Sequence, residues 1–135
     1  HFDLILMLQP TSPLRTVEDV TGAVKYLLES QLDSVWSMSR TDSKNHPLKQ
    51  FKINNNSLDY YDISGAKIIA RQQLEPLYQK NGAIYVFTRD CILAQKTIKG
   101  QKTGAYLIDR EMISIDTTFD FKLAEFIMRN DSEKN

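Results

Sequence analysis

The sequence has little cysteine, no excess charge of either sign and no long hydrophobic run. Cys91 is the single cysteine among the 135 residues, so the chain makes neither an intrachain disulfide nor a cysteine-based metal cluster. A lone thiol is typical of proteins that stay in a reducing compartment. We therefore expect a cytoplasmic location.

Positive and negative side chains are present in equal number. Lys and Arg total 17 and Asp and Glu total 17, so the formal net charge at pH 7 is zero. Proteins that bind nucleic acid or an anionic membrane usually carry a basic excess. We expect no nucleic acid and no membrane as partners, and any anion has to be bound by a few well-placed side chains.

The hydrophobic runs are short. The longest, Leu4–Leu8, is far below the roughly 20 apolar residues that cross a bilayer. It follows no basic segment and precedes no small-residue cleavage site, so a signal peptide is not expected. A composition of 41% hydrophobic and 25% charged residues is that of a globular protein, and the length predicts one domain, 1–135.

The start of the chain predicts an α/β protein. Phe2–Leu8 is apolar throughout and is followed by Pro10, which indicates a fully buried strand and then a stiff loop. Thr16 and Asp19 resemble a capping box that opens a helix. The apolar residues of this helix are expected on one side: Val17, Val20, Val24, Leu27 and Leu28.

Later segments continue this pattern and interrupt it once. Lys49–Ile53 and Ser57–Asp62 predict two strands of a hairpin around an Asn-Asn-Asn turn. Such a hairpin gains stability by packing on a second chain, so we expect 45–80 to be an inserted dimerisation region and the protein to be a homodimer. Further strands are expected at Ser34–Ser39, Ala83–Thr88, Tyr106–Ile108 and Met112–Ile115, and helices around Cys91–Lys96 and over Phe119–Met128, the latter capped by Thr117 or Thr118.

Three places offer chemistry, each with a plainer alternative. Gln9 and Arg15 follow a predicted strand, where α/β proteins receive ligands, but their loop equally serves to stiffen a connection. Arg71 is a candidate anion ligand or a solvated loop residue, and Asn81-Gly82 is first of all a turn signal. Asp116, between a strand and a helix, suits Mg²⁺ or a helix cap.

Four segments in this order resemble the acylneuraminate cytidylyltransferases, the CMP-sialic acid synthetase family. The segments are Leu8–Arg15, His46–Lys49, Arg71–Tyr78 running into Asn81–Tyr85, and Ile115–Thr117 with Asp120 and Ala124-Glu125. The resemblance implies a partial Rossmann-like nucleotide-diphospho-sugar transferase sheet that carries an inserted β-hairpin dimerisation region. It also implies transfer of CMP from CTP to a sialic-acid-type sugar, with Mg²⁺ and with no covalent nucleophile.

The resemblance assigns the site residues. Asp116 is expected to bind the metal and, with Arg71, to serve catalysis. The expected substrate-binding residues are Gln9, Arg15, Lys49, Gln72, Tyr78, Asn81 and Gly82.

The sequence departs from the family pattern in two ways. Many members read Asp-Ile-Asp where this chain reads Ser114-Ile115-Asp116, so one metal-binding carboxylate is replaced by a hydroxyl. The family's phosphate-binding loop, with its Ala-Arg and Gly-Ser-Lys segments, does not occur in the 135 residues. We therefore expect this chain alone to be inactive. The alternatives are a non-catalytic, self-associating remnant that binds a partner or a sugar acid, and a cytidylyltransferase for a pseudaminic or legionaminic acid.

Overall fold

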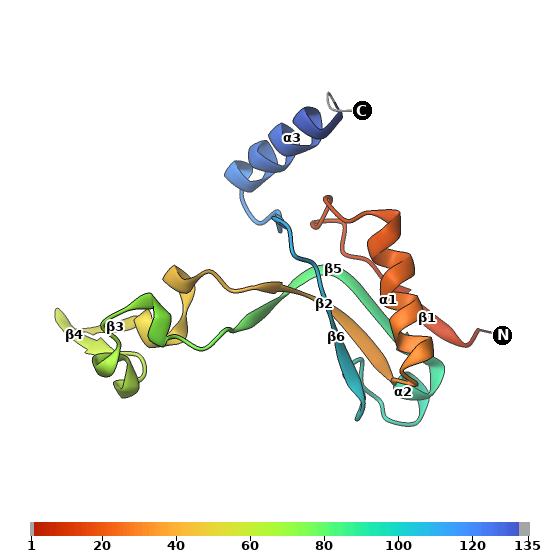
Figure 1. The fold of residues 1–135 in the computed structure, drawn as a ribbon, viewed down its shortest axis with the longest axis horizontal. Coiled ribbons are helices and arrows are strands. Elements are labelled where there is room, and N and C mark those ends of the chain that lie inside the picture. Colours follow the sequence, from red (N-terminus) through yellow and green to blue (C-terminus); the bar gives the residue numbers. More distant parts are fainter. Residues whose placement is uncertain (1, 133–135) are drawn as a thin grey trace. The chain divides into compact units, whose positions relative to one another are not determined.

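A four-stranded mixed sheet forms the centre of one of two compact units in the computed structural model, which describes residues 2–132 (Figure 1). This unit contains the residues up to Ser39 and those from Lys80 onward, and the other contains Arg40–Gln79. The order of the sheet is β1-β5-β2-β6. Its strands are β1 (Leu4–Met7), β5 (Tyr78–Thr88), β2 (Ser34–Arg40) and β6 (Thr103–Leu107).

The sheet is mixed because β5 runs against its neighbours. β1 pairs antiparallel with β5, and β2 pairs parallel with β6. The amide of Thr88 donates to the Asp33 carbonyl at 2.8 Å, whereas Ile84 contacts Ser37 further along β2. Residue numbers therefore rise along β5 as they fall along β2, and β1 and β2 point the same way on either side of β5.

The expectation that Phe2–Leu8 is a fully buried strand is wrong. β1 covers only Leu4–Met7, and Leu6, Met7 and Leu8 are exposed. β1 lies at the end of the sheet, and its outer edge has no partner strand among the described residues. An uninterrupted apolar run predicts that both faces of the strand are buried. A strand at the end of a sheet has a neighbouring strand on one edge only, so more of its side chains stay exposed.

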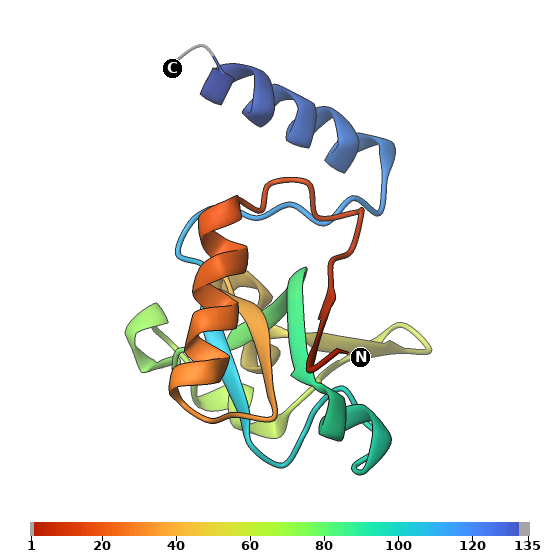
Figure 2. The ribbon, with the colours of Figure 1, turned by 90° about the vertical axis from the view of Figure 1, so that its right-hand side faces the viewer.

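Helix α1 (Val17–Glu29) begins as the sequence predicts and lies against the sheet (Figure 2). Thr16 is the N-cap, and Thr16 and Asp19 form the expected capping box. The predicted apolar side is only partly right, because Val17 is 73% and Leu28 58% exposed. The buried side is centred on Ala23 and Leu27, the residues that face the strands.

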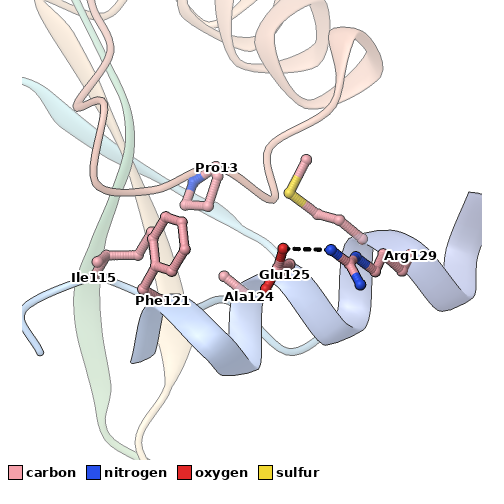
Figure 3. A pocket seen from close by; sticks show the side chains of 7 residues that line it. Pro13, Ile115, Phe121, Ala124, Glu125 and Arg129 are labelled. Atoms are coloured by element: carbon pink, nitrogen blue, oxygen red, sulfur yellow. Dashed lines mark hydrogen bonds and ion pairs between the residues drawn. The ribbon is translucent and has the colours of Figure 1, made fainter. Parts of the chain in front are cut away.

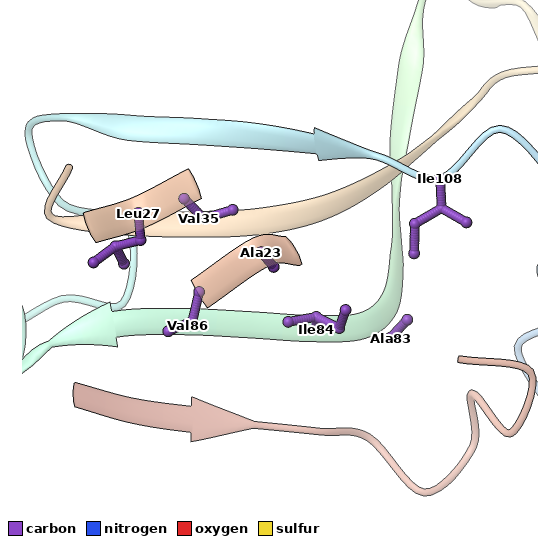
Figure 4. Packing of buried hydrophobic residues seen from close by; sticks show 7 residues of the cluster. All are labelled: Ala23, Leu27, Val35, Ala83, Ile84, Val86 and Ile108. Carbon is purple, nitrogen blue, oxygen red and sulfur yellow. The ribbon is translucent and has the colours of Figure 1, made fainter. Parts of the chain in front are cut away.

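The hydrophobic core lies between α1 and the sheet (Figure 4). Alternation along β5 sends Ile84 and Val86 toward α1 and Tyr85 and Phe87 to the opposite face. On that face Tyr85 packs edge-on against Trp36, with ring centroids 5.2 Å apart. β5 thus supplies both sides of the core, which explains why its residues 81–87 are all buried.

Two helices follow β5 in the chain. α2 (Arg89–Leu93) is short, and α3 (Thr118–Ser132) includes the predicted helix and extends past Met128. The predicted strand Met112–Ile115 is wrong, because the segment forms no ladder and makes one backbone bond, from the Ile115 amide to the Thr11 carbonyl at 2.8 Å. No helix within residues 2–132 has the length and apolar character needed to span a membrane.

The unit Arg40–Gln79 contains the hairpin that the sequence predicts. Strands β3 (Phe51–Asn54) and β4 (Ser57–Tyr60) pair antiparallel. Asn55 and Asn56 connect them with φ values of 48° and 66°, as a two-residue turn of type I′ requires. Short 3₁₀ helices complete the unit, and the role of the hairpin in dimerisation stays a prediction.

A partly buried ion pair that sequence patterns missed ties α1 to the chain after β6. Asp19 is only 7% exposed, and its carboxylate accepts from Arg110 Nη1 at 2.9 Å. The same guanidinium donates to the Leu14 carbonyl at 2.9 Å. The hydrogen bond from Arg110 is the main cause that lowers the pKa of Asp19 below its usual 3.8.

Asp19→Ala is expected to lower the free energy of unfolding by about 2 kcal/mol, because it removes both a cap acceptor and the partner of Arg110. A lowered folded-state pKa means that this stabilisation is complete above about pH 4 and is lost as the pH falls through the folded value. Urea unfolding of both proteins from pH 2 to 7 checks this, and the difference between them should shrink in acid. Arg129→Ala, which breaks an exposed pair with Glu125, is the control and should cost about 0.5 kcal/mol or less. An equal cost for both changes would contradict the assignment.

Candidate functional site

Three of the predicted site residues meet where the loop after β1 contacts β5. Ser12 Oγ donates to the Asn81 carbonyl at 2.9 Å and so ties this loop to the strand. The Gln9 side chain lies over Gly82, where a Cβ would stand 2.1 Å from Gln9 Oε1. We call Gln9, Ser12, Asn81 and Gly82 the loop–strand site. It lies at the carboxyl ends of β1 and β2, where α/β proteins commonly bind ligands.

The prediction that Asn81-Gly82 forms a turn before the strand is wrong. Both residues lie inside β5, which begins at Tyr78, and both are buried. Gly82 has a φ of +73°, a conformation that residues with a Cβ rarely adopt. An Asn-Gly pair signals this backbone conformation correctly, but a strand can also contain it where a loop packs closely against the chain.

The carboxamide of Asn81 is held by two serines of β2 that sequence patterns missed. Its Oδ1 accepts from Ser37 Oγ at 2.6 Å and from the Ala83 amide at 3.1 Å, and its Nδ2 donates to Ser39 Oγ at 3.0 Å. Serines two residues apart in a strand share one face, which is a signal in the sequence. The signal is weak, because it does not say which strand lies opposite.

Arg15 acts within the loop. Its Nη1 donates to the carbonyl of Gln9 at 2.7 Å and to that of Ser12 at 2.8 Å. These charge-assisted bonds hold the loop in the shape that carries the Gln9 side chain. The hydrogen bonds of Arg15 Nη1 agree with the plainer interpretation, in which Arg15 stiffens the loop. A role of Arg15 in anion binding stays a prediction.

Asp116 follows Ile115, whose amide donates to the Thr11 carbonyl of the same loop, whereas Asp120 caps α3. Asp120 Oδ2 accepts from the amides of Asp116 and Thr117 at 3.2 and 2.8 Å, and the hydrogen bond from the Thr117 hydroxyl is the main cause that lowers the pKa of Asp120. Thr117 is the N-cap, since its Oγ1 accepts from the Asp120 amide at 3.2 Å. The Asp116 carboxylate is exposed, and no described residue donates a hydrogen bond to it.

The fit to Mg²⁺ is limited to one carboxylate. Within residues 2–132, no three His, Cys, Asp or Glu side chains gather as metal ligands. Magnesium is often held by one or two carboxylates, with substrate phosphates and water as its other ligands. Asp116 fits the role of such a single ligand, and Asp120 does not, because its carboxylate caps α3.

The unit Arg40–Gln79 brings two of the predicted cationic residues together. Lys49 and Arg71 line a pocket of about 340 Å³ whose walls include Phe51 and Tyr60. The rings of Phe51 and Tyr60 are tilted by 35° to one another, with centroids 4.7 Å apart. Gln72 lies in the 3₁₀ helix that starts at Arg71, and Tyr78 is exposed at the first position of β5; neither lines this pocket.

A larger pocket, of about 560 Å³, lies beside α3 (Figure 3). Pro13, Ile115 and Phe121 form much of its apolar wall. Its charged groups are Glu125 and Arg129, which pair with one another at 2.7 Å. A sugar acid or a polyphosphate needs free cations or hydrogen-bond donors, so this pocket suits neither.

The mixed sheet makes the chain an α/β protein, and its polar groups lie at the ends of parallel strands, where such proteins commonly bind ligands. No protein-family model matches it. CMP-N,N'-diacetyllegionaminic acid synthase of Legionella pneumophila is 31% identical over 98% of the chain and 56% of its own length. N-acylneuraminate cytidylyltransferase of Streptococcus agalactiae is 31% identical over 86% of the chain and 28% of its own length. Post-translational flagellin modification protein B of Campylobacter coli is 24% identical over 100% and 55%.

The chain is therefore similar, over most of its own length, to proteins named as acylneuraminate cytidylyltransferases and to a related synthase. It spans about half the length of the synthase from Legionella and of the Campylobacter protein, and less than a third of the streptococcal transferase.

Gly82→Ala is expected to lower the free energy of unfolding by about 1–3 kcal/mol, because the new Cβ meets both a positive φ and the Gln9 side chain. Urea unfolding measures the loss. Adding Gln9→Ala should recover the part that comes from crowding and leave the part that comes from φ. A Gly82→Ala protein as stable as the wild type would contradict the observed backbone conformation.

Proposed function

We propose that this chain carries the sugar-acid side of a cytidylyltransferase that transfers CMP from CTP to a sialic-acid-type sugar. The observation that carries the proposal is the placement of Gln9 over Gly82 at the carboxyl end of β1. The names of the relatives support the class of reaction, since two of them are an N-acylneuraminate cytidylyltransferase and a CMP-legionaminic acid synthase.

The chemistry requires positioning and charge neutralisation. The anomeric hydroxyl of the sugar attacks the α-phosphate of CTP, the bond between the α- and β-phosphates breaks to release pyrophosphate, and the hydroxyl proton passes to solvent water. No covalent nucleophile is needed, and the candidate residues are amides, cations and a carboxylate. The Gln9 carboxamide has the donor and acceptor to hold sugar hydroxyl or amide groups. Lys49 and Arg71 offer positive charge to a carboxylate, and a bound Mg²⁺ supplies charge neutralisation on the phosphates.

The remaining predicted residues receive roles in metal binding, catalysis and sugar binding. Asp116 is proposed as the one protein carboxylate that would hold the metal, and Arg71 as the cation that serves both binding and catalysis. Tyr78 and Gln72 are exposed, and their part in sugar binding is carried by the family resemblance alone.

A second candidate function is a non-catalytic module that binds a sugar acid or a partner and self-associates. Ser114 favours it, because it stands where many family members carry a second metal-binding carboxylate. Turnover of CTP distinguishes the two functions.

Isothermal titration calorimetry tests the proposed function. We expect N-acetylneuraminic acid or a legionaminic acid to bind the chain, and Gln9→Ala to weaken binding by about tenfold, because one hydrogen-bonded amide contact contributes on the order of 1–2 kcal/mol. Gln101→Ala, which changes an exposed glutamine on another loop, is the matched control and should leave affinity unchanged. Equal affinity for Gln9→Ala and the wild type would reject the assigned site.

The same titration with CTP and Mg²⁺ tests the expected inactivity of the 135-residue polypeptide. We expect no CTP binding and no CMP-sugar formation. Clear CTP binding that is lost on Asp116→Asn would contradict this expectation and support a nucleotide site built around Asp116. The cytoplasmic location stays a prediction from the single cysteine.

We also propose that the protein is a homodimer that associates through the unit Arg40–Gln79. One face of the hairpin is apolar and exposed, with Ile53 at 76% and Leu58 at 64% directly opposite one another. The other face carries the polar pair Lys52 and Asp59. Exposed apolar surface of this kind is typical of an interface.

Light scattering after size-exclusion chromatography is expected to give the mass of a dimer at micromolar concentration. Ile53→Lys with Leu58→Lys should give a monomer, because two charges would be buried in the interface. Lys52→Ala with Asp59→Ala changes the opposite face of the hairpin and should leave the dimer intact. A monomeric wild type would reject the proposal.

A further inference from the structure

Asn81 has little capacity left to contact a ligand. It is only 8% exposed, and its Oδ1 already accepts two hydrogen bonds, from Ser37 Oγ and from the Ala83 amide. Its Nδ2 donates to Ser39 Oγ at 3.0 Å, so one N–H remains without a partner among the described residues. A carboxamide bound in this way holds the chain in place more than it binds a substrate.

The donors and acceptors around the Asn81 carboxamide determine which of its two ends is the oxygen and which is the nitrogen. The amide of Ala83 can only donate, so the Asn81 atom that faces it must be the oxygen, and the nitrogen must face Ser39. Ser37 Oγ accepts from the Ile84 amide at 2.8 Å. The single hydroxyl proton of Ser37 has two possible acceptors, Asn81 Oδ1 at 2.6 Å and the Ile84 carbonyl at 3.1 Å, and Asn81 Oδ1 is the nearer one. Each serine thus recognises one end of the carboxamide.

The orientation of the carboxamide determines the backbone that supports Gln9. The bond from the Ala83 amide to Asn81 Oδ1 spans Gly82 and stabilises its φ of +73°. Ser12 Oγ binds the Asn81 carbonyl, so the loop that carries Gln9 is attached to the same residue. A shift of Asn81 would therefore move both sides of the loop–strand site.

We propose that Ser37 and Ser39 are positioning residues of the sugar-acid site, which act by fixing Asn81 and, through it, the approach of Gln9 to Gly82. The inference rests on the proposed function for the identity of the ligand. The arrangement of the side chains of Ser37, Ser39, Asn81 and Gln9 is tested without any ligand.

Ser34 provides a matched control on the same strand. It is as fully buried as Ser37, and its hydroxyl is hydrogen-bonded to Thr103 Oγ1 at 2.7 Å and to the Gly100 amide at 3.3 Å. It stands at the first position of β2, away from Asn81. Ser34→Ala therefore removes an equally buried hydroxyl from the same sheet without touching the loop–strand site.

Calorimetry with N-acetylneuraminic acid compares the variants. Ser37→Ala is expected to weaken binding by about tenfold, Ser39→Ala by less, and Ser34→Ala by no more than about twofold. In an Asn81→Ala background, Ser37→Ala should cost no further affinity, because the proposed effect of the serine on the ligand passes through the Asn81 side chain. Equal losses for Ser37→Ala and Ser34→Ala, or additive losses with Asn81→Ala, would overturn the inference.

The side-chain amide signals of Asn81 in ¹⁵N NMR provide the readout without a ligand. In the wild type and Ser34→Ala they should be well separated and slow to exchange with water, and in Ser37→Ala they should lose both properties. If the wild type binds no sugar acid but these signals behave as expected, the proposed function fails and the positioning role stands. Signals that are unchanged in Ser37→Ala and in Ser39→Ala would overturn the positioning role.

Discussion

The backbone of β5 at Asn81 and Gly82 is the constraint on which the larger unit depends. This strand supplies residues to both faces of the core, and near its start it adopts a conformation that only glycine adopts easily. The missing Cβ lets the loop after β1 pack against the strand, and the hydroxyl of Ser12 closes the contact. The backbone at Gly82 therefore connects the hydrophobic core to the loop–strand site, which lies at the carboxyl ends of the parallel strands β1 and β2.

Several charged and amide side chains of this unit form hydrogen bonds that stabilise the fold, and this leaves them less able to bind a ligand. Arg15 holds the loop through backbone carbonyls, Asp120 caps α3, and Asn81 is bound on both ends of its carboxamide. Gln9 and Asp116 differ, because no described residue hydrogen-bonds their side chains. Buried polar groups need partners, whereas groups that receive a ligand keep some capacity free. This contrast separates the candidates that the family resemblance treats alike.

Sequence patterns predicted the elements whose signals are local. The capping box of Thr16 and Asp19, the hairpin turn at Asn55 and Asn56, and the N-cap of α3 depend on residues within a few positions of one another. The strand predicted at Met112–Ile115 fails because a strand requires a partner, and the apolar pattern says nothing of whether one is near. The motifs around Gln9 and Asn81 likewise pointed to the site but not to its internal bonds.

The sequence by itself determined the α/β class, the hairpin, the N-caps of α1 and α3 and the resemblance to a family, because these follow from short patterns and from ordered motifs. Only the tertiary structure decided that β5 lies between β1 and β2, that Asp19 pairs with Arg110, and that Ser37 holds Asn81. The last two contacts join residues 91 and 44 positions apart. Contacts at such separations depend on how the whole chain packs, and no local pattern encodes which partner a buried polar group will meet.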